Sequence, residues 1–343
     1  MENFIGILSP KLSAELIAKR AAHVSIVDDG IKLLSEEVFR ALKCGKLAIQ
    51  NFSQNELHPS PDNESAVPWL FLVDTLNFSF WYPEGYAKKW EVTWQGKTYT
   101  GYFALCAAVN RAISEGVPMT DAKFCSNVTL DQLRHILRGD KETDVPLLHA
   151  RVDCLREVGN VLMDKYQGSF VNCLKESQNS AQKLLQLVVD NFPCFRDEAE
   201  FEGYAVSFYK RAQILIGDIW ACFKGEGVGY FKDIDSLSMF ADYRVPQVLV
   251  HFGAMKYTDE LMELLKSGHI LANGSREEVE IRGVSIEVVE RVCKQVRQLL
   301  QEYNINNVTV NSVLIDHYLW DYRREHADSL EYIPFHKVRC IYY

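Results

Sequence analysis

The chain has 343 residues, of which 48% are apolar and 24% are charged, and its formal net charge is -9. This composition is typical of a globular protein with a sizeable core, which excludes a disordered chain. The acidic total charge provides no broad basic field, so it disfavours a nucleic-acid polymer as the ligand. A small ligand is still allowed, because a local pocket can be basic or acidic whatever the total charge.

The nine cysteines are scattered along the chain, and no two of them form a C-x-x-C pair. This spacing excludes zinc ribbons and C-x-x-C redox motifs, and it predicts reduced thiols in the core. The sequence has no stretch of 18 apolar residues, and residues 1–4 do not begin a secretory signal. We therefore expect a soluble cytoplasmic protein with no membrane partner.

Helical spacing of apolar residues dominates the chain. Two helices are expected before a long loop at 51–68, and Pro246 and Thr258 are expected to begin later helices. The expected helices span residues 9–20, 29–47, 104–115, 130–137, 146–165, 170–189, 206–223, 259–266, 284–303 and 311–328.

A small antiparallel β element is expected at about residues 69–100. The run 69–81 ends in alternation of apolar and polar residues, and the segments 90–94 and 97–100 flank Gln95-Gly96 as in a hairpin. The predicted fold class is therefore mainly α (α+β), a helical body that carries a small antiparallel β element.

Common short motifs of nucleotide, zinc and acyl-transfer enzymes are missing from the sequence. The Gly-rich run at 225–229 lacks a preceding strand and the lysine of a phosphate loop, so we interpret it as a turn. The candidate chemistry must therefore come from other polar residues in apolar surroundings.

The stretch Phe240-Ala-Asp-Tyr-Arg-Val-Pro-Gln247 places Asp242 near the amino terminus of a helix. Asp242 can be a capping residue that accepts backbone N–H bonds, or a fixed anion that faces a developing cation. A second cluster, 314–322, puts His317 and Asp321 four residues apart on a helix, with Asp316 on an adjoining face. These groups form either a solvated ion pair or part of a cleft.

Two further runs allow a structural and a functional interpretation. Residues 74–81 combine a carboxylate and an amide with aromatic rings on an expected strand, which suits either a core face or stacking of a flat base. Lys210 and Arg211 lie on an otherwise apolar helix, which suits a bound phosphate or an internal ion pair.

These residues resemble a known family, the queuosine salvage proteins, which are queuosine-5′-phosphate N-glycosylases (hydrolases). The resemblance covers essentially the whole chain. It rests on a set of segments in a fixed order, namely residues 74–81, 96–99, 105–111, 207–215, 239–249, 278–283 and 318–322.

The resemblance implies a single domain over residues 1–343, with a helical fold similar to the helix–hairpin–helix DNA glycosylases. It implies hydrolysis of the N-glycosidic bond of queuosine 5′-monophosphate to release queuine for tRNA modification, without a metal or other cofactor. Asp242 matches the catalytic carboxylate. Matches to the base pocket are Phe240, Asp316, His317 and Asp321, and further substrate-binding candidates are Asn55, His58, Asp74, Asn77, Lys210, Arg211, Tyr243, Arg244 and Tyr322.

The expected chemistry agrees with these residue types. Cleavage of a glycosidic C–N bond develops oxocarbenium charge on the ribose, which a carboxylate such as Asp242 stabilises or captures. Queuine is a 7-deazaguanine with a secondary amine, and its donor-rich edge and cationic amine call for carboxylates such as Asp316 and Asp321.

Two alternatives stay open at this point. The protein could carry a modified base or nucleotide without cleaving it, or it could be a nucleic-acid glycosylase, against which the acidic charge counts. Release of free queuine separates a hydrolase from a carrier. The sequence leaves the oligomeric state open.

Overall fold

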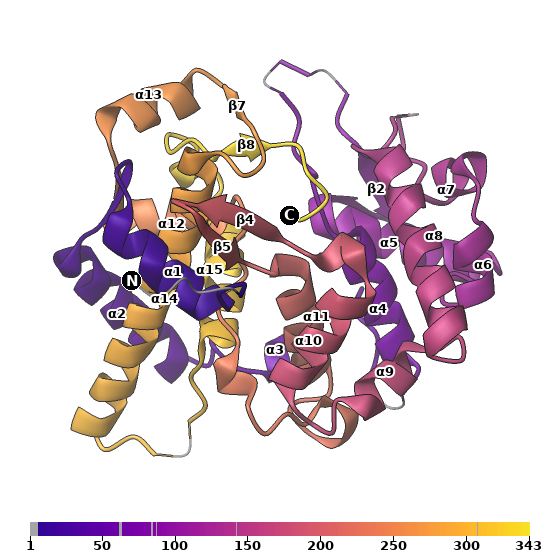
Figure 1. Ribbon diagram of the computed structural model, residues 1–343, viewed down its shortest axis with the longest axis horizontal. Coiled ribbons are helices and arrows are strands. Elements are labelled where there is room, and N and C mark those ends of the chain that lie inside the picture. Colours follow the sequence, from indigo (N-terminus) through magenta and orange to yellow (C-terminus); the bar gives the residue numbers. More distant parts are fainter. Residues whose placement is uncertain (1–5, 62–63, 84, 87, 142, 307) are drawn as a thin grey trace. The chain divides into compact units, whose positions relative to one another are not determined.

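The computed structural model describes residues 6–61, 64–83, 85–86, 88–141, 143–306 and 308–343 (Figure 1). Residues 1–4, where no secretory signal is expected, lie outside the described residues. The described chain forms two compact units. The first comprises residues within 1–51, 197–213 and 235–339, and the second comprises residues within 52–196, 214–234 and 340–343.

The first unit is built around the long helix α14 (Arg276–Glu302). At Gly283 a Cβ would lie 2.6 Å from Cδ1 of Ile17, so a glycine is needed for the close approach of α1. Four helices pack against α14 or against one another beside it. They are α1 (Pro10–Arg20), α2 (Asp28–Lys43), α12 (Val245–His251) and α15 (Ser312–Glu325), and α13 (Asp259–Lys266) and the 3₁₀ turn η4 (Asp328–Leu330) complete the helical part.

Short two-stranded sheets complete the first unit. In the antiparallel pair of β1 (Val24–Ile26) and β6 (Met255–Tyr257), Ile26 is opposite Met255. The other two pairs are the antiparallel β4 (Glu198–Phe201) and β5 (Tyr204–Ser207), and the parallel β7 (Ile270–Leu271) and β8 (Lys337–Val338).

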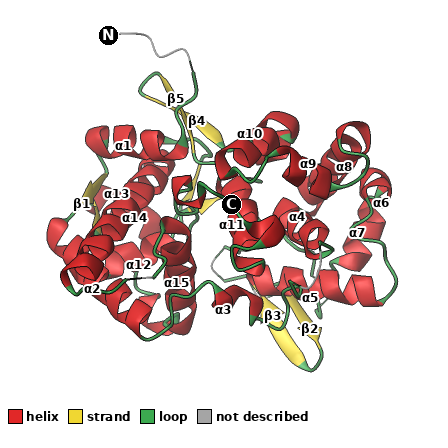
Figure 2. Cartoon of the chain, turned by 90° about the horizontal axis from the view of Figure 1, so that it is seen from below, coloured by secondary structure: helices red, strands yellow, loops and turns green. Residues whose placement is uncertain are grey.

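The second unit is also mainly helical, and it contains the hairpin of β2 (Glu91–Trp94) and β3 (Lys97–Thr100), drawn in yellow in Figure 2. Gln95 and Gly96 both have positive φ, at 49° and 79°, as a tight hairpin turn requires. The helices are α4 (Ala66–Leu76), α5 (Gly101–Ser114), α6 (Ala122–Asn127), α7 (Leu130–Ile136), α8 (Leu148–Lys165), α9 (Phe170–Glu176) and α10 (Ala181–Asn191), with the 3₁₀ turns η1 (Pro193–Phe195) and η2 (Gly227–Gly229).

Stacked aromatic rings fill part of the core of the second unit. The rings of Phe71 and Phe170 lie 4.2 Å apart between centroids, and Phe192 meets Phe71 edge-on at 5.2 Å. Three elements contain residues of both units or border them along the chain: α3 (Gln50–Ser53), α11 (Lys210–Cys222) and the 3₁₀ turn η3 (Ile234–Ser236).

The mainly helical class and most of the expected helices are confirmed. So is the hairpin at 90–100. The Gly-rich run at 225–229 forms a turn that ends in η2, as interpreted. All nine cysteines are free, and all except Cys44 are buried. None of the described helices is both long and apolar enough to cross a membrane.

The expected strand in the run 69–81 is wrong. Residues 66–76 form helix α4, in which every residue except Pro68 is buried. A helix that is apolar on all sides shows no clear period, so its sequence is easily mistaken for a buried strand. Residues 77–80 are irregular, with Ser79 at φ 52°.

Several expected helices have wrong bounds, and the long loop at 51–68 is shorter than expected. Helix α14 begins at Arg276 rather than at residue 284, and α2 ends at Lys43 rather than at residue 47. The helix at 170–189 is broken into α9 and α10, because Gln178 and Asn179 adopt positive φ and Ser180 caps a new helix. The helix at 206–223 begins at Lys210, since Val206 belongs to β5 and Tyr209 has φ 49°. Residues 50–53 form α3, and α4 begins at Ala66.

Candidate active site

Residues 238–242 form an irregular segment of the first unit that ends at Asp242. No strand pairs with it in the described part of the chain, so side chains satisfy its backbone groups. The N–H of Ser238 donates to Oε1 of Gln213 at 2.8 Å. The N–H of Phe240 donates to Oδ1 of Asp316 at 3.0 Å. The segment is therefore fixed by residues from distant parts of the sequence.

Asp242 lies two residues before the N-cap of α12 and binds the first turn of that helix. Its Oδ1 accepts the N–H groups of Arg244 at 2.9 Å and of Val245 at 2.8 Å. The expected capping role is thereby confirmed, and Pro246 occupies the first turn of α12 as predicted. These two bonds hold the carboxylate in one orientation.

The electrostatic surroundings of Asp242 are those of a buried anion. The residue is only 9% exposed, and burial raises the pKa of its carboxyl group above the ordinary value. The charge of Lys210 and the N–H bonds from Val245 and Arg244 act in the opposite direction. A carboxylate held in this way interacts strongly with positive charge that develops beside it.

Helix α15 carries four of the predicted residues, Asp316, His317, Asp321 and Tyr322, in the first unit. It begins after Asn311, whose side chain accepts the N–H of Leu314 at 3.0 Å. Asp316 is buried and holds the backbone of Phe240, as described above. The imidazole of His317 lies 5.9 Å from the ring of Phe240 between centroids. The structure therefore places Phe240, Asp316 and His317 together.

His317 and Asp321 influence each other across one turn of α15. Burial lowers the pKa of His317 to about 4, and Asp321 acts against this shift. Asp321 keeps an exposed surface, but the protein around its carboxyl group removes part of the hydration and raises its pKa, which His317 opposes. His317 is therefore neutral at neutral pH and can both donate and accept a hydrogen bond.

Tyr243, Arg244 and Tyr322 lie on the same unit. The guanidinium of Arg244 is 4.1 Å from the ring centroid of Phe335 and 5.3 Å from that of Tyr243. The ring of Tyr322 stacks on His326 with centroids 4.0 Å apart. These contacts explain their packing, and the expected roles in substrate binding stay predictions.

Lys210 and Arg211 begin helix α11 and differ in their surroundings. The backbone N–H of Lys210 donates to Oδ2 of Asp197 at 3.0 Å, and the charge of Lys210 acts on Asp242. Arg211 is only 1% exposed, which favours an internal partner for its guanidinium. Of the two cations, Lys210 is therefore the one associated with the candidate carboxylate.

Asp74 and Asn77 belong to the second unit, which is described by itself. Asp74 lies in α4 and Asn77 ends that helix, and neither lies on a strand as expected. Both are buried, and Nδ2 of Asn77 donates to Oδ1 of Asp74 at 3.4 Å. Their contact with substrate stays a prediction.

Asn55 and His58, also in the second unit, stabilise their own loop. Oδ1 of Asn55 accepts the N–H of Leu57 at 3.0 Å. Nδ1 of His58 lies 2.8 Å from the carbonyl oxygen of Phe52, and its Nε2 lies 3.1 Å from the hydroxyl of Tyr102. Because a carbonyl oxygen only accepts, Nδ1 carries the proton and Nε2 accepts from the hydroxyl. Substrate contact by Asn55 and His58 stays a prediction.

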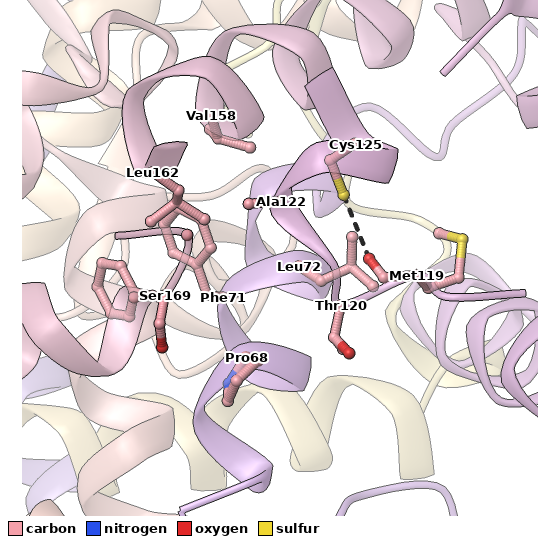
Figure 3. Close-up of a pocket in the computed structure, with 12 residues that line it drawn as sticks. Pro68, Phe71, Leu72, Met119, Thr120, Ala122, Cys125, Val158, Leu162 and Ser169 are labelled. Atoms are coloured by element: carbon pink, nitrogen blue, oxygen red, sulfur yellow. Dashed lines mark hydrogen bonds between the residues drawn. The ribbon is translucent and has the colours of Figure 1, made fainter. Parts of the chain in front are cut away.

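A small cavity of about 60 Å³ lies in the second unit, and its labelled lining residues are shown in Figure 3. Its lining is mostly apolar and includes no carboxylate or cation. The thiol of Cys125 donates to the carbonyl oxygen of Met119 at 3.2 Å, and burial raises its pKa to about 12. This cavity therefore does not suit a charged ligand or a thiolate nucleophile.

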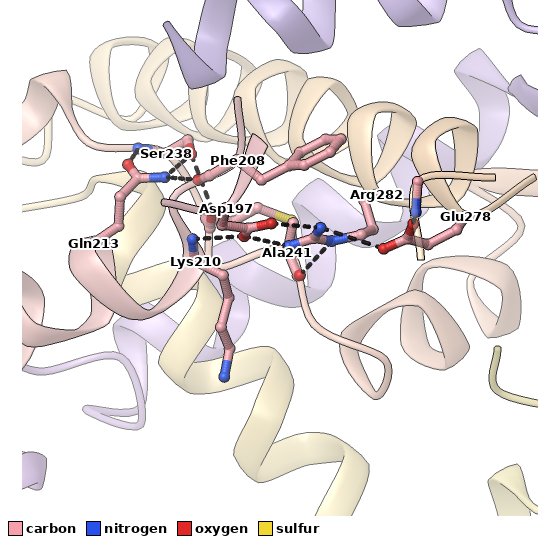
Figure 4. A network of polar contacts seen from close by, with 10 residues as sticks. Asp197, Phe208, Lys210, Gln213, Ser238, Ala241, Glu278 and Arg282 are labelled. Carbon is pink, nitrogen blue, oxygen red and sulfur yellow. Dashed lines mark hydrogen bonds and ion pairs between the residues drawn. The ribbon is translucent and has the colours of Figure 1, made fainter. Parts of the chain in front are cut away.

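Three residues that were not predicted as site residues hold the 238–242 segment: Gln213 and Arg282 directly, and Asp197 through Arg282. Arg282 donates from Nε to the carbonyl oxygen of Ala241 at 3.0 Å and pairs with Asp197 (Figure 4). The sequence does contain a signal for Arg282, because this arginine stands among apolar residues in the buried half of α14. Such a cation needs an internal partner.

Among the described residues, no group of three or more His, Cys, Asp or Glu side chains is placed to hold a metal ion. The first unit provides a buried carboxylate, Asp242, and a lysine whose charge acts on it, Lys210. It also provides the neutral imidazole of His317 beside an aromatic ring.

A family model described as "Queuosine salvage protein" matches residues 57–343. The chain belongs to the queuosine salvage protein family. It is 48% identical to a protein of Bos taurus named queuosine 5′-phosphate N-glycosylase/hydrolase, over 98% of this chain and 99% of the relative. Relatives of the same name are 48% identical in Mus musculus and 36% identical in Schizosaccharomyces pombe, and these matches cover at least 96% of either chain. The family resemblance inferred from the motifs is thereby confirmed.

In this member of the family, the motif 239–249 forms most of the irregular segment and the start of α12. The motif 278–283 forms the first buried stretch of α14, and 318–322 lies within α15. Three of the motifs that carry the resemblance thus belong to the first unit, and one of them contains Asp242.

Proposed function

We propose that the protein hydrolyses the N-glycosidic bond of queuosine 5′-monophosphate and releases queuine for salvage. The observation that carries this proposal is the buried carboxylate of Asp242, fixed by two backbone N–H groups beside Lys210. Family membership supports it, because the relatives are named for this activity. The proposed enzyme is an N-glycosidic hydrolase that needs no cofactor.

In the proposed reaction, the bond between C1′ of the ribose and the base nitrogen breaks, and the base leaves with the electron pair. Positive charge on the ribose is stabilised by Asp242, as an electrostatic partner or as a nucleophile. Oδ1 accepts both backbone bonds, so we assign Oδ2 to face C1′. Water supplies a hydroxyl group to C1′ and a proton to the base, which gives ribose 5-phosphate and queuine.

We assign the base to the residues around Phe240. Its ring offers a face for the flat 7-deazaguanine, and His317 at 5.9 Å offers a neutral imidazole. The cationic amine of queuine calls for a carboxylate, for which we propose Asp321, and Asp316 serves the donor-rich edge. Tyr322, Tyr243 and Arg244 are further candidates in this unit. For the second unit, taken by itself, we propose Asn55, His58, Asp74 and Asn77 as substrate-binding residues.

We assign the 5′-phosphate to Lys210, with Arg211 as a second candidate. Among the charges that act on Asp242, that of Lys210 has the largest effect on its pKa, so we propose this lysine as the partner of the phosphate. Binding energy from this remote group can orient C1′ against Asp242, which raises the rate as well as the affinity.

We also propose the form of the substrate, the location of the protein, its domain organisation and its fold type. The net charge of -9 favours a free nucleotide over a nucleic-acid polymer. We propose a cytoplasmic location, a single functional domain over residues 1–343, and a helical fold similar to the helix–hairpin–helix DNA glycosylases.

The test is to incubate the purified protein with queuosine 5′-monophosphate and to separate the products by chromatography. The nucleoside queuosine and queuosine-containing tRNA are treated in parallel. Rapid release of queuine from the monophosphate, and much slower release from the other two, supports the proposal. Binding of intact nucleotide without release identifies a carrier. Comparable release from tRNA identifies a nucleic-acid glycosylase.

A further inference from the structure

Asp197 and Arg282 form a buried ion pair in the first unit, and both are at most 2% exposed. Nη1 of Arg282 lies 2.9 Å from Oδ1 of Asp197, and Nη2 lies 2.5 Å from Oδ2. This bidentate geometry fixes the orientation of the guanidinium plane as well as its distance from the carboxylate of Asp197. The face of the guanidinium lies 4.2 Å from the ring centroid of Phe208, which restricts it further.

Each member of the pair also binds backbone next to a proposed catalytic or binding residue. Nε of Arg282 donates to the carbonyl oxygen of Ala241 at 3.0 Å, one residue before Asp242. Oδ2 of Asp197 accepts the backbone N–H of Lys210 at 3.0 Å. Figure 4 shows this chain of contacts running from Lys210 through Asp197 and Arg282 to Ala241.

We propose that Arg282 and Asp197 are positioning residues that hold Asp242 and Lys210 in one fixed frame for catalysis. This role rests on the proposed function, because it concerns the placement of the carboxylate and the cation of that reaction. Neither residue needs to touch the substrate.

The 238–242 segment needs such positioning residues because no described strand pairs with it. A strand in a sheet is placed by many backbone bonds, whereas this segment depends on a few side chains. Arg282 provides the contact nearest to Asp242, and a guanidinium can serve Asp197 and Ala241 at once because its donors point in fixed directions. A lysine has the same charge but lacks this geometry.

The test compares Arg282→Lys with a matched control, Glu280→Gln. Glu280 is a fully buried carboxylate on the same helix, and it accepts the backbone N–H groups of Ala22 and His23 at 2.9 and 2.6 Å. Both changes weaken a buried interaction of α14, since Glu280→Gln keeps an acceptor oxygen but loses the charge that pairs with Arg276. Only the first one affects the backbone next to Asp242.

The expected kinetic result is a loss of kcat for Arg282→Lys with little change in KM, after correction for the folded fraction. A loss of about 10-fold or more is expected, since a displacement on the order of 1 Å can cost about 10²-fold in rate. Glu280→Gln should lower thermal stability and leave kcat unchanged. A kcat for Arg282→Lys equal to that of Glu280→Gln would overturn the proposal.

The dependence of kcat/KM on pH provides a second measurement, which a general loss of stability would leave unchanged. The cations that act on Asp242 are Lys210, Arg244 and Arg323. If the hold on the 238–242 segment loosens, Asp242 interacts less with these cations and with the N–H groups of Arg244 and Val245. The pKa of its carboxyl group then rises further. The acid limb of kcat/KM should therefore move to higher pH in Arg282→Lys and stay in place in Glu280→Gln.

Amide hydrogen exchange tests the same frame without any turnover. Arg282→Lys should speed exchange in peptides that cover residues 238–245, while Glu280→Gln should not. If the wild-type protein releases no queuine, the proposed function fails, and exchange still decides whether the pair holds the segment. Unchanged exchange in Arg282→Lys contradicts the positioning role.

A second variant covers the case in which Arg282→Lys does not fold. Asp197→Asn keeps the shape and an acceptor for the N–H of Lys210, but it loses the charge that orients Arg282. It should reproduce the losses in kcat and exchange protection. In the wild-type chain, the N–H groups of Phe240 and Val245 should exchange far more slowly than an open loop, and loop-like exchange there would overturn the proposal without any variant.

Discussion

The carboxylate of Asp316 accepts the backbone N–H of Phe240 at 3.0 Å, which joins helix α15 to the segment that carries Asp242. A residue expected to bind the base thus also holds the backbone of its neighbour in the same site. Its two roles can be separated, because an amide keeps an acceptor oxygen and loses only the negative charge.

Asp316→Ala should therefore destabilise the protein more than Asp316→Asn. The alanine leaves the N–H of Phe240 buried without this acceptor, at a cost of about 1–3 kcal/mol in the free energy of unfolding. The asparagine should keep most of that stability. Urea denaturation of the two variants measures the difference, and equal stabilities would show that the bond contributes little.

Asp242→Asn should lose activity by about 10²-fold or more, because it removes the anion and nearly preserves the shape. Its melting temperature should stay the same or rise. The folded carboxyl has a raised pKa, so at neutral pH the buried anion lowers stability relative to a neutral amide. Calorimetry checks this sign, and a clear fall in melting temperature would show that the negative charge of Asp242 stabilises the folded chain.

Asp321→Ala should weaken substrate binding more than it lowers stability. Loss of a charge-assisted bond of about 1.5–3 kcal/mol weakens binding on the order of 10- to 100-fold. Binding of intact queuosine 5′-monophosphate is measured in an Asp242→Asn background, with and without the change at Asp321. Asp328→Ala, an exposed carboxylate in the same unit, is the control. Unchanged affinity would assign Asp321 to its interaction with His317 instead.

The neutral His317 should make stability depend on pH. Its folded pKa of about 4 lies below the ordinary value of 6.5, so the unfolded chain binds its proton first as pH falls. The contribution of His317 is complete above about pH 6.5 and is lost as pH falls towards about 4. His317→Asn should therefore lose less stability than wild type between neutral and acidic pH. Equal losses in urea denaturation would contradict the shift.

The parts of the fold with local signals could be predicted from the sequence. Thr258 and Gly268 mark both ends of α13, and Gln95-Gly96 marks the hairpin turn, because each acts through its own backbone. Helix α4 was missed because it is apolar on all sides and has no period to detect. The breaks at Gln178 and Tyr209 depend on positive φ values at residues that do not require them.

The candidate site, too, could be predicted only where its residues have local signals in the sequence. Asp242 could be placed at a helix start from the following proline, and His317 and Asp321 could be paired from their spacing. The contact of Asp316 with Phe240 joins residues 76 positions apart, and that of Arg282 with Asp197 joins residues 85 apart. No local pattern encodes such contacts, so only the folded chain shows that they place Asp242.

The central claim is that Asp242 drives hydrolysis of queuosine 5′-monophosphate. The most direct measurement is single-turnover release of queuine by wild type and by Asp242→Asn, with an excess of enzyme over substrate at neutral pH. We predict complete conversion to queuine and ribose 5-phosphate by wild type, and release slower by about 10²-fold or more in the folded variant that still binds the nucleotide. Release at the wild-type rate by Asp242→Asn, or intact nucleotide recovered from the wild-type protein, would contradict the claim.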